Sequence, residues 1–392
     1  MTTTRNVRIA IAATTVFAVA GVIVLRANGR EAEVRAGEAV ALPTPETPAD
    51  PWSVPPGGDA QIPVYERFET LTTADGLPSD RVTTVTVEGD DLFVGTEDGA
   101  AFRRGGVWTQ IRTSDGLPHR FVTSVARDRA SDVTWLTTLR GVVRVSGGAL
   151  EVLSQKTSGL QNDVVYHAVV DGPRVWFATA SGTSILDTRT GSWSMYDSDN
   201  SIMNEPWNYS VALGPERAWI GVWAGGVVEL NRRTNRWREY RDPDGELEID
   251  LLPDDGALHE VSSFISYDAG LLWQATYFGV ARFDGRRWSS WTQADGGLPG
   301  DFVVHVAARG RAAWIASDQG FGVIAGDTVV SYVRSPDGTC VARTVRAGKE
   351  TGTRTLATAP GDNATTWIAP GEGDVWIATG HGLSHGVEAA RR

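Results

Sequence analysis

Cysteine and lysine are nearly absent from this chain of 392 residues, which has one cysteine, Cys340, and two lysines, Lys156 and Lys349. A single cysteine excludes an intrachain disulfide, a zinc site with several cysteine ligands and paired-cysteine haem attachment. Acidic residues outnumber basic ones, 48 to 36, and the formal net charge is -12. Because binding to duplex nucleic acid needs a basic surface, this balance argues against nucleic acid as a partner.

Most of the common catalytic motifs are missing from the sequence as well. It contains no P-loop, no dinucleotide fingerprint and no His-Glu-x-x-His zinc motif. Its Gly-x-Ser-x-Gly match, Gly382 to Gly386, falls in a predicted glycine turn and third strand of the last repeat, not in the strand-to-helix turn of a nucleophile elbow. The histidines are scattered: His119, His259 and His381 fall in predicted loops, whereas His167 and His305 fall inside predicted inner strands, facing the channel or a neighbouring sheet. We therefore predict no catalytic residue, no metal site and no cofactor.

Long apolar runs are scarce, and the clearest is Ile9 to Leu25, 17 residues preceded by Arg5 and Arg8. At ~1.5 Å per residue this run is at the short end for a transmembrane helix. A cleaved signal peptide is the alternative, because Ala18-Val19-Ala20 offers a small-residue cleavage site. The apolar residues after it favour an uncleaved signal-anchor helix over 9–25, with residues 1–8 as a short cytoplasmic tail and the bulk of the chain periplasmic or extracellular.

Residues 26–63 contain seven prolines among many alanine, glutamate and glycine residues. Such a composition cannot build a hydrophobic core, and it is typical of an extended linker. We expect this linker to hold the folded part of the chain away from the membrane.

Glycine (44 residues) and tryptophan (15 residues) are abundant, and both recur in an internal repeat. The segment Asp75-Gly-Leu-Pro78 returns as Asp115-Gly-Leu-Pro118, as Ser158-Gly-Leu160 and, with one extra glycine, as Asp295-Gly-Gly-Leu-Pro299. Weaker copies begin near Asn200, Asp255 and Gly361. Each copy continues into an alternating strand and then a second strand that ends in a Trp-x-x-Thr-like motif. Seven such motifs occur, beginning at Leu92, Trp135, Trp176, Trp219, Trp273, Trp314 and Trp376.

A glycine turn and two further strands complete each repeat, and the last strand carries an apolar pair three residues apart, such as Trp108 and Ile111. Four short strands in about 40 residues are typical of a propeller blade. We predict an all-β, seven-bladed β-propeller over residues 64–392. The last repeat ends after its third strand, whereas Tyr65 and Phe68 match the missing apolar pair, so we expect residues 64–72 to complete the last blade.

These motifs resemble the two-component regulator propeller family, whose repeat reads roughly Asp-Gly-Leu-Pro-Ser-Asn, an inner strand, Trp-Ile-Gly-Thr and a glycine turn. The match covers roughly residues 64–389. The resemblance implies an extracytoplasmic sensor part of a membrane-bound regulator. Since no kinase, receiver or DNA-binding segment follows the propeller in this sequence, we expect any signal to pass through the single helix or a membrane signalling partner.

In a propeller, the Asp-Gly-Leu-Pro turns and the turns after Trp-x-x-Thr lie on one face, which we call the loop face. Two insertions, 241–255 and 334–360, are predicted to be long loops there. Four residues after each turn glycine stand Asp80, Arg120, Asp163, Glu205, Glu260 and Asp301, with Thr365 in the seventh place. This ring of mostly acidic residues either attracts a cation or cationic ligand, or caps nearby backbone N–H groups.

Aromatic residues gather at the same predicted rim: Trp207, Trp223, Tyr277, Phe278 and Phe321. They either form a platform for a sugar or peptide, or pack between blades. With the loop-face histidines His119, His259 and His381, they complete the candidate ligand-binding residues. We predict a sensor or interaction module that binds a protein, peptide or saccharide on the loop face. The alternatives are a propeller enzyme, such as a lyase or glycan hydrolase, and a scaffold for envelope assembly.

Overall fold

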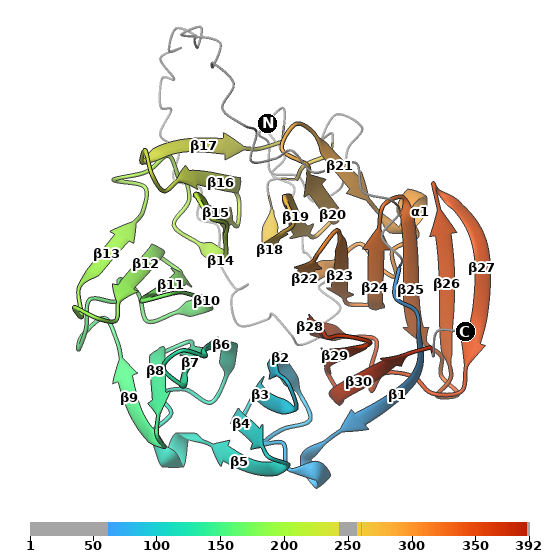
Figure 1. Cartoon of the computed structure of the whole chain (residues 1–392), viewed down its shortest axis with the longest axis horizontal. Helices are drawn as coiled ribbons and strands as arrows, with labels where there is room; N and C mark the ends of the chain where they lie inside the picture. Colours follow the sequence, from blue (N-terminus) through green and yellow to red (C-terminus); the bar gives the residue numbers. More distant parts are fainter. Residues whose placement is uncertain (1–61, 243–256, 260, 390–392) are drawn as a thin grey trace, which may run out of the picture.

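The computed structural model describes residues 62–242, 257–259 and 261–389, and within them seven sheets form a ring (Figure 1). The prediction of an all-β, seven-bladed propeller is confirmed. None of the helices in this part of the chain has the length and apolarity needed to cross a membrane. The predicted helix over 9–25, and nearly all of the linker, lie outside the described residues.

Each blade is an antiparallel sheet whose first strand lies at the channel and whose last strand lies outside. The first three blades are β2 (Val82–Glu88), β3 (Asp91–Thr96), β4 (Gly99–Arg104) and β5 (Val107–Ile111); β6 (Val122–Asp128), β7 (Val133–Thr138), β8 (Gly141–Ser146) and β9 (Ala149–Leu153); and β10 (Val165–Asp171), β11 (Arg174–Thr179), β12 (Gly182–Asp187) and β13 (Trp193–Tyr196).

Blades four and five are β14 (Asn208–Leu213), β15 (Arg217–Val222), β16 (Gly226–Asn231) and β17 (Arg236–Tyr240); and β18 (Ser262–Asp268), β19 (Leu271–Thr276), β20 (Gly279–Phe283) and β21 (Trp288–Trp291). Blade six has β22 (Val303–Arg309), β23 (Ala312–Ser317), β24 (Gly320–Ala325), β25 (Thr328–Arg334), β26 (Cys340–Arg346) and β27 (Lys349–Leu356). Blade seven has β28 (Thr365–Pro370), β29 (Asp374–Thr379), β30 (Gly382–Glu388) and β1 (Tyr65–Leu71).

The Asp-Gly-Leu-Pro repeat is a capped turn between blades. In the first copy, η1 (Thr73–Asp75), the Asp75 carboxylate accepts the Thr72 N–H at 2.8 Å, and Gly76 follows with φ 116°. Only glycine adopts that backbone conformation without strain. The leucine after it, Leu77, is 1% exposed. The turns η2 (Thr113–Asp115) and α1 (Gln293–Gly296) are built in the same way, so the motif recurs because each blade junction needs a capped turn and an apolar anchor.

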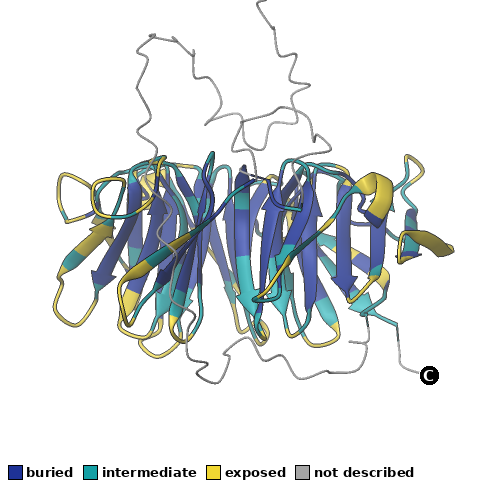
Figure 2. Cartoon of the chain, turned by 90° about the horizontal axis from the view of Figure 1, so that it is seen from above, coloured by how far each residue is buried: buried dark blue, intermediate teal, exposed yellow. Residues whose placement is uncertain are grey.

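The threonine of the Trp-x-x-Thr motif fixes the next turn. In blade one the Thr96 hydroxyl donates to the Gly99 carbonyl at 2.8 Å, and the Gly99 N–H donates to the Arg120 carbonyl of blade two at 2.7 Å. The hydroxyl bond recurs in blades two, three, five, six and seven. The tryptophans of the motif pack between sheets, as Trp135 of blade two does against Phe177 of blade three. The buried residues accordingly fill the strands, whereas exposed residues lie mainly in the loops of both faces (Figure 2).

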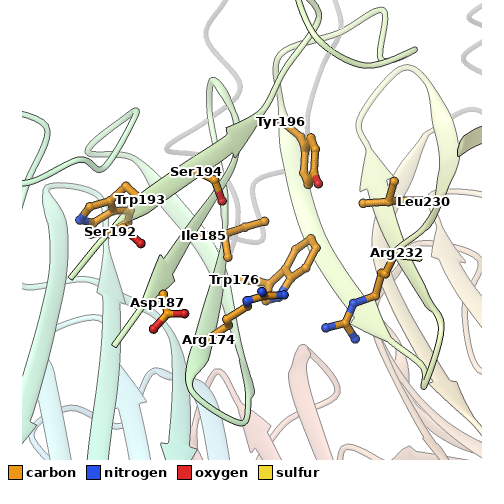
Figure 3. A pocket seen from close by; sticks show the side chains of 10 residues that line it. All are labelled: Arg174, Trp176, Ile185, Asp187, Ser192, Trp193, Ser194, Tyr196, Leu230 and Arg232. Atoms are coloured by element: carbon orange, nitrogen blue, oxygen red, sulfur yellow. The ribbon is translucent and has the colours of Figure 1, made fainter. Parts of the chain in front are cut away.

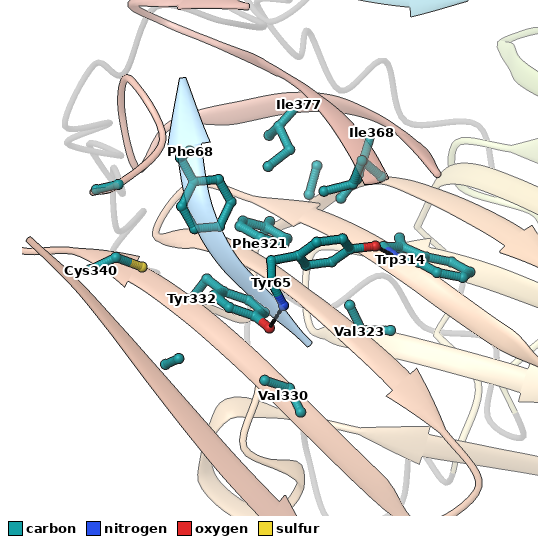
Figure 4. Close-up of a cluster of buried hydrophobic side chains, with 14 of the residues drawn as sticks. Tyr65, Phe68, Trp314, Phe321, Val323, Val330, Tyr332, Cys340, Ile368 and Ile377 are labelled. Carbon is teal, nitrogen blue, oxygen red and sulfur yellow. Dashed lines mark hydrogen bonds between the residues drawn. The ribbon is translucent and has the colours of Figure 1, made fainter. Parts of the chain in front are cut away.

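The two ends of the described chain meet in blade seven. Strand β1 pairs antiparallel with β30, from Tyr65 opposite Glu388 to Leu71 opposite Leu383. Tyr65 and Phe68 are buried against blade six, in a cluster that includes Phe321 and Tyr332 (Figure 4). An N-terminal strand therefore supplies the outermost strand of the last sheet.

Blade six differs from the expectation for residues 334–360. In place of a long loop, β26 and β27 form a hairpin that adds two strands to the outside of the sheet. Strand β26 buries Cys340 and Ala342, two residues apart, as in a strand with one packed face. Val345 is buried after the register shift that follows Thr344. The other insertion, 241–255, lies almost entirely outside the described residues.

Candidate functional site

The innermost strands of the seven blades share one irregularity, a register shift between their first and third residues. Because each inner strand is the edge of its sheet, some of its N–H and C=O groups lack a strand partner. The side chains of the preceding blade bind these groups. Positions within the inner strands are therefore comparable from blade to blade, and departures from the common pattern can be recognised.

In four blades, the side chain at the third position accepts the N–H of the fourth residue of the next blade. Ser124 and Ser210 do so through Oγ at 3.1 and 3.0 Å, toward Ala168 and Ile265. His167 does so through Nδ1 at 3.3 Å, toward Val211. His305 makes the equivalent bond to Ile368, also at 3.3 Å. These two histidines therefore link blades, and serine does the same work elsewhere in the ring.

At the second position, a hydroxyl donates to the carbonyl of the first residue of the next blade. Four blades follow this rule through Thr83, Thr123, Ser263 and Thr366, at 2.6 to 2.8 Å. In blade six the position holds the buried Val304. Val304 has no hydroxyl to donate, and in blades three and four Tyr166 and Tyr209 make no such bond. The linking rule is therefore broken at three blades, and at the two adjacent ones the replacement is a tyrosine.

Tyr166 and Tyr209 lie against each other, with ring centroids 4.6 Å apart in an edge-to-face arrangement. Among the described residues, neither phenolic oxygen has a hydrogen-bond partner. Burial raises the pKa of both phenols, and the nearby Tyr277 adds to the effect. Both groups therefore stay protonated over the physiological range and keep an O–H donor available at the loop-face mouth of the channel.

Further aromatic residues extend this pair along the mouth. Trp207, immediately before β14, contacts Trp223, immediately after β15, at 5.5 Å. Tyr277 lies near Trp223 and stacks on Phe302 with ring centroids 4.3 Å apart. All are half-buried and come from blades three to six. We call this set the aromatic rim: Tyr166, Trp207, Tyr209, Trp223, Tyr277 and Phe302.

The sequence analysis identified three of these residues, Trp207, Trp223 and Tyr277. It missed Tyr166, Tyr209 and Phe302, although aligning the second position of the inner strands would have singled out the two tyrosines. Phe278 lies beside the rim and contacts His259 in a tilted arrangement, with ring centroids 4.2 Å apart. For Phe321 the structure shows the second of the two alternatives, packing between blades, because it is fully buried between blades six and seven and stacked on Tyr332 with ring centroids 4.5 Å apart.

Three members of the predicted acidic ring bond to their own turns. The carboxylates of Asp80, Asp163 and Asp301 accept the N–H groups of Thr73, Gln155 and Gln293 at 2.6, 2.6 and 2.5 Å. Each aspartate therefore closes the loop that precedes its inner strand.

The remaining members of that ring do not share this geometry. Arg120 is exposed and takes part through its backbone carbonyl. In the other blades the ring position lies two residues before the inner strand. In blade four that position is held by Pro206, and Glu205 precedes it by one residue. In blade seven that place is held by Asn363, which accepts the Arg334 N–H at 2.6 Å, whereas Thr365 is the first residue of the strand. Glu260 lies outside the described residues.

The loop-face histidines are separated from one another along the ring. The Nδ1 atoms of His119 and His259 accept the N–H two residues further on, both at 3.1 Å, in blades two and five. His381 is exposed in the turn between β29 and β30 of blade seven. In the part of the chain that the structure describes, no three His, Cys, Asp or Glu residues form a group that could hold a metal ion.

A hollow of about 250 Å³ lies between the outer parts of blades three and four (Figure 3). The Arg232 guanidinium lies over the Trp176 ring at 5.6 Å and forms an ion pair with Asp171. Because these contacts join blades three and four, the residues that line this hollow have a structural role in holding the two blades together.

The architecture is similar to several solved propellers. The extracellular domain of the putative hybrid two-component system BT4673 from B. thetaiotaomicron matches with a TM-score of 0.62 at 12% identity, over 84% of this chain and 40% of that one. The extracellular domain of BT3049, from the same organism, matches with a TM-score of 0.53 at 15% identity, over 81% of this chain and 52% of that one. Virginiamycin B lyase from Staphylococcus aureus matches with a TM-score of 0.56 at 13% identity, over 83% of this chain and 99% of that one.

This chain thus spans about half, or less, of the two extracellular domains. At these identities the likeness shows the fold alone. No family model matches the sequence, and no curated protein matches it.

Proposed function

We propose that this chain is an extracytoplasmic β-propeller that binds a ligand or partner protein at the aromatic rim and acts as a sensor or interaction module. The observation that supports this proposal is the break in the linking rule at Tyr166 and Tyr209. A protein that gives up two interblade hydrogen bonds at adjacent positions loses stability there, and such local exceptions are expected at functional sites.

The chemistry of the rim suits a saccharide or a peptide. Half-buried aromatic rings offer flat apolar surfaces, and two phenols without protein partners offer hydrogen bonds to hydroxyl or carbonyl groups of a ligand. The rings lie at strand ends or directly beside them on a closed scaffold, so little order has to be gained on binding. The nearby predicted residues Phe278, His259 and Asp301 belong to the same part of the loop face.

The location is part of the proposal. We propose that residues 9–25 anchor the chain in a membrane, that the proline-rich linker spaces the propeller from it, and that binding is passed to a membrane signalling partner. The similarity to extracellular domains of two-component systems supports a position outside the cytoplasm. A net charge of -12 disfavours nucleic acid as the partner.

The test uses a panel of linear oligosaccharides and synthetic peptides, titrated against the chain while tryptophan emission is recorded. We expect at least one panel class to bind and to change the emission of Trp207 and Trp223. Replacing Tyr209 or Trp207 by alanine should weaken that binding by about tenfold or more, as expected for loss of a central aromatic contact.

The control is Trp237→Ala, which removes an indole from the outermost strand of the same blade. Circular dichroism would verify that all variants fold. If the rim variants bind every panel member as the wild type does, the aromatic rim is not the binding site and the proposal fails.

A further inference from the structure

The channel holds a second hollow that is separate from the aromatic rim. The third-position residues His167, Phe264, His305 and Trp367 form a layer across the channel, with ring centroids 3.9 to 5.9 Å apart in contacting pairs. Beyond this layer, away from the loop face, a cavity of about 880 Å³ is lined by the later residues of six inner strands. Cavities of this size accommodate ligands of drug-like size.

The walls of this cavity combine apolar surface with polar groups that are already bonded. Val85, Val169, Leu213, Ile265 and Ala307 line it, each from a different blade. Thr86 and Ser266 line it as well, but the Thr86 hydroxyl donates to the Val125 carbonyl at 2.6 Å and the Ser266 hydroxyl accepts the Ala308 N–H at 2.9 Å. The apolar part of the wall favours an occupant with apolar faces, because transfer of such surface from water is favourable.

The charged groups at the cavity's outer edge already have partners. Arg232 is paired with Asp171. Arg309 donates to the Glu372 carboxylate at 3.1 Å and to the Pro370 carbonyl at 3.3 Å. The two Asp268 carboxylate oxygens accept the Ala269 and Gly310 N–H groups at 2.8 and 2.7 Å. An anion entering the cavity would find neither arginine unpaired, and both oxygens of Asp268 are already hydrogen-bonded, so these groups favour an uncharged occupant.

The floor of the cavity supplies two hydrogen-bond donors. His167 and His305 both line it, and each uses Nδ1 to accept a backbone N–H. The neutral ring therefore carries its proton on Nε2, and no described residue accepts that proton. Burial holds the pKa of His167 at about 3 and that of His305 well below its usual value, so both rings stay neutral. His305 is 3% exposed and lines this cavity, so an acceptor for its Nε2–H has to come from within the cavity.

We propose that this cavity is a second binding site, for a flat, uncharged apolar molecule whose carbonyl or ether oxygen accepts a hydrogen bond from Nε2 of His305 or His167. The rings of Trp367 and Phe264 give the flat face of such a molecule a surface to stack on. This site is independent of the rim and of the function proposed for it.

The probe is 6-propionyl-2-dimethylaminonaphthalene, an uncharged naphthalene ketone whose emission reports both apolarity and hydrogen bonding at its carbonyl. We expect it to bind with blue-shifted emission, and 2-acetylnaphthalene to displace it about fivefold better than 2-ethylnaphthalene, which has no acceptor. Filling the cavity from two different blades, with Ala307→Phe or Ala369→Phe, should weaken probe binding about tenfold or more. The control Ala149→Phe adds the same ring at an exposed site on β9 and should change nothing.

The donor is tested with His305→Ser and His167→Ser. Serine accepts the interblade N–H at this position in blades two and four, so the fold should survive while the Nε2 donors are lost. The preference for the ketone over 2-ethylnaphthalene should then disappear. The inference is overturned if the probe does not bind, or if both cavity-filling variants fold yet bind it normally. It is also overturned if the wild type binds 2-acetylnaphthalene and 2-ethylnaphthalene equally. Loss of probe binding in Trp207→Ala would overturn it as well, because that result would place the probe at the rim.

Discussion

At the scale of single residues, the inner strands show how one position serves different chemistry in different blades. Serine and histidine both accept an N–H at the third position, and threonine and serine donate to a carbonyl at the second. The histidines therefore contribute to interblade bonding, which explains why they occur without a metal-ligand spacing in the sequence.

Replacing His167 by alanine should destabilise the protein more than replacing it by serine. Both substitutions remove the ring, but only alanine leaves the Val211 N–H without its acceptor, and an unpaired buried N–H costs about 1–3 kcal/mol. Denaturant unfolding of the two variants measures the difference. Equal midpoints for alanine and serine would contradict the role assigned to this bond.

An ion cluster between blades one and two should make stability sensitive to acid. Hydrogen bonds from Arg104 and Arg127 lower the pKa of Asp132 from 3.8 to about 2, against the effect of its slight burial. Glu88 and Asp91 face the same arginines. Because folding lowers the pKa of Asp132, the ion cluster stabilises the fold fully at pH values above the pKa of the unfolded state. This stabilisation is lost as the pH falls through the pKa of the folded state.

We therefore expect Asp132→Asn to lower the melting temperature at neutral pH and to have a shrinking effect as pH falls from about 4 toward 2. Asparagine suits this site because the residue has φ 54°, a conformation that asparagine tolerates. Thermal melts across this pH range measure the effect, and wild-type and variant curves that stay parallel would contradict it.

At the scale of elements, β1 is held by a short chain of buried hydrogen bonds. The Trp314 indole N–H donates to the Tyr65 hydroxyl at 2.7 Å, and the Tyr65 N–H donates to the Tyr332 hydroxyl at 2.9 Å. Because Trp314 and Tyr332 belong to blade six, the closing strand of blade seven is fixed to its neighbour as well as to β30.

Removing the Tyr65 hydroxyl alone, in Tyr65→Phe, should cost about 1–3 kcal/mol, since it leaves the buried Trp314 indole without an acceptor. The matched control is Tyr196→Phe, at a half-buried tyrosine on the outer strand of blade three, where a smaller loss is expected. Equilibrium unfolding in urea compares the two. A loss at Tyr65 no larger than that at Tyr196 would argue against the hydrogen-bonded closure.

At the scale of the whole molecule, the ring is stable only when closed, because each blade buries its faces against its neighbours. Without β1, strand β30 becomes an exposed edge and the surfaces that cover Phe321 and Tyr332 are lost. The last blade is therefore the place where the ring is most easily opened.

A chain beginning at residue 72 should melt far below a chain beginning at residue 62. Burying Tyr65 and Phe68 contributes roughly 2 kcal/mol or more for each residue, and the β1–β30 hydrogen bonds are lost as well. Calorimetry of the two chains measures the difference. The same melting temperature for both would show that the ring does not depend on its N-terminal strand.

The repeat made the fold predictable, because its turn and its Trp-x-x-Thr motif are required at nearly every blade junction. The candidate site was predicted only in part. Trp207, Trp223 and Tyr277 adjoin motifs that can be aligned, whereas Tyr166 and Tyr209 are recognised only once the register of the inner strands is known. A shift of one residue, as at Glu205, changes which side chain faces the channel.

The sequence by itself determined the number of blades, their strand order and the place of the closing strand, because these follow from local patterns repeated along the chain. Only the tertiary structure decided which residues meet at the channel, that β26 and β27 widen blade six, and that a cavity lies beyond the histidine layer. These features arise from contacts between residues of different blades, whose distances depend on how the ring closes and which no local pattern encodes.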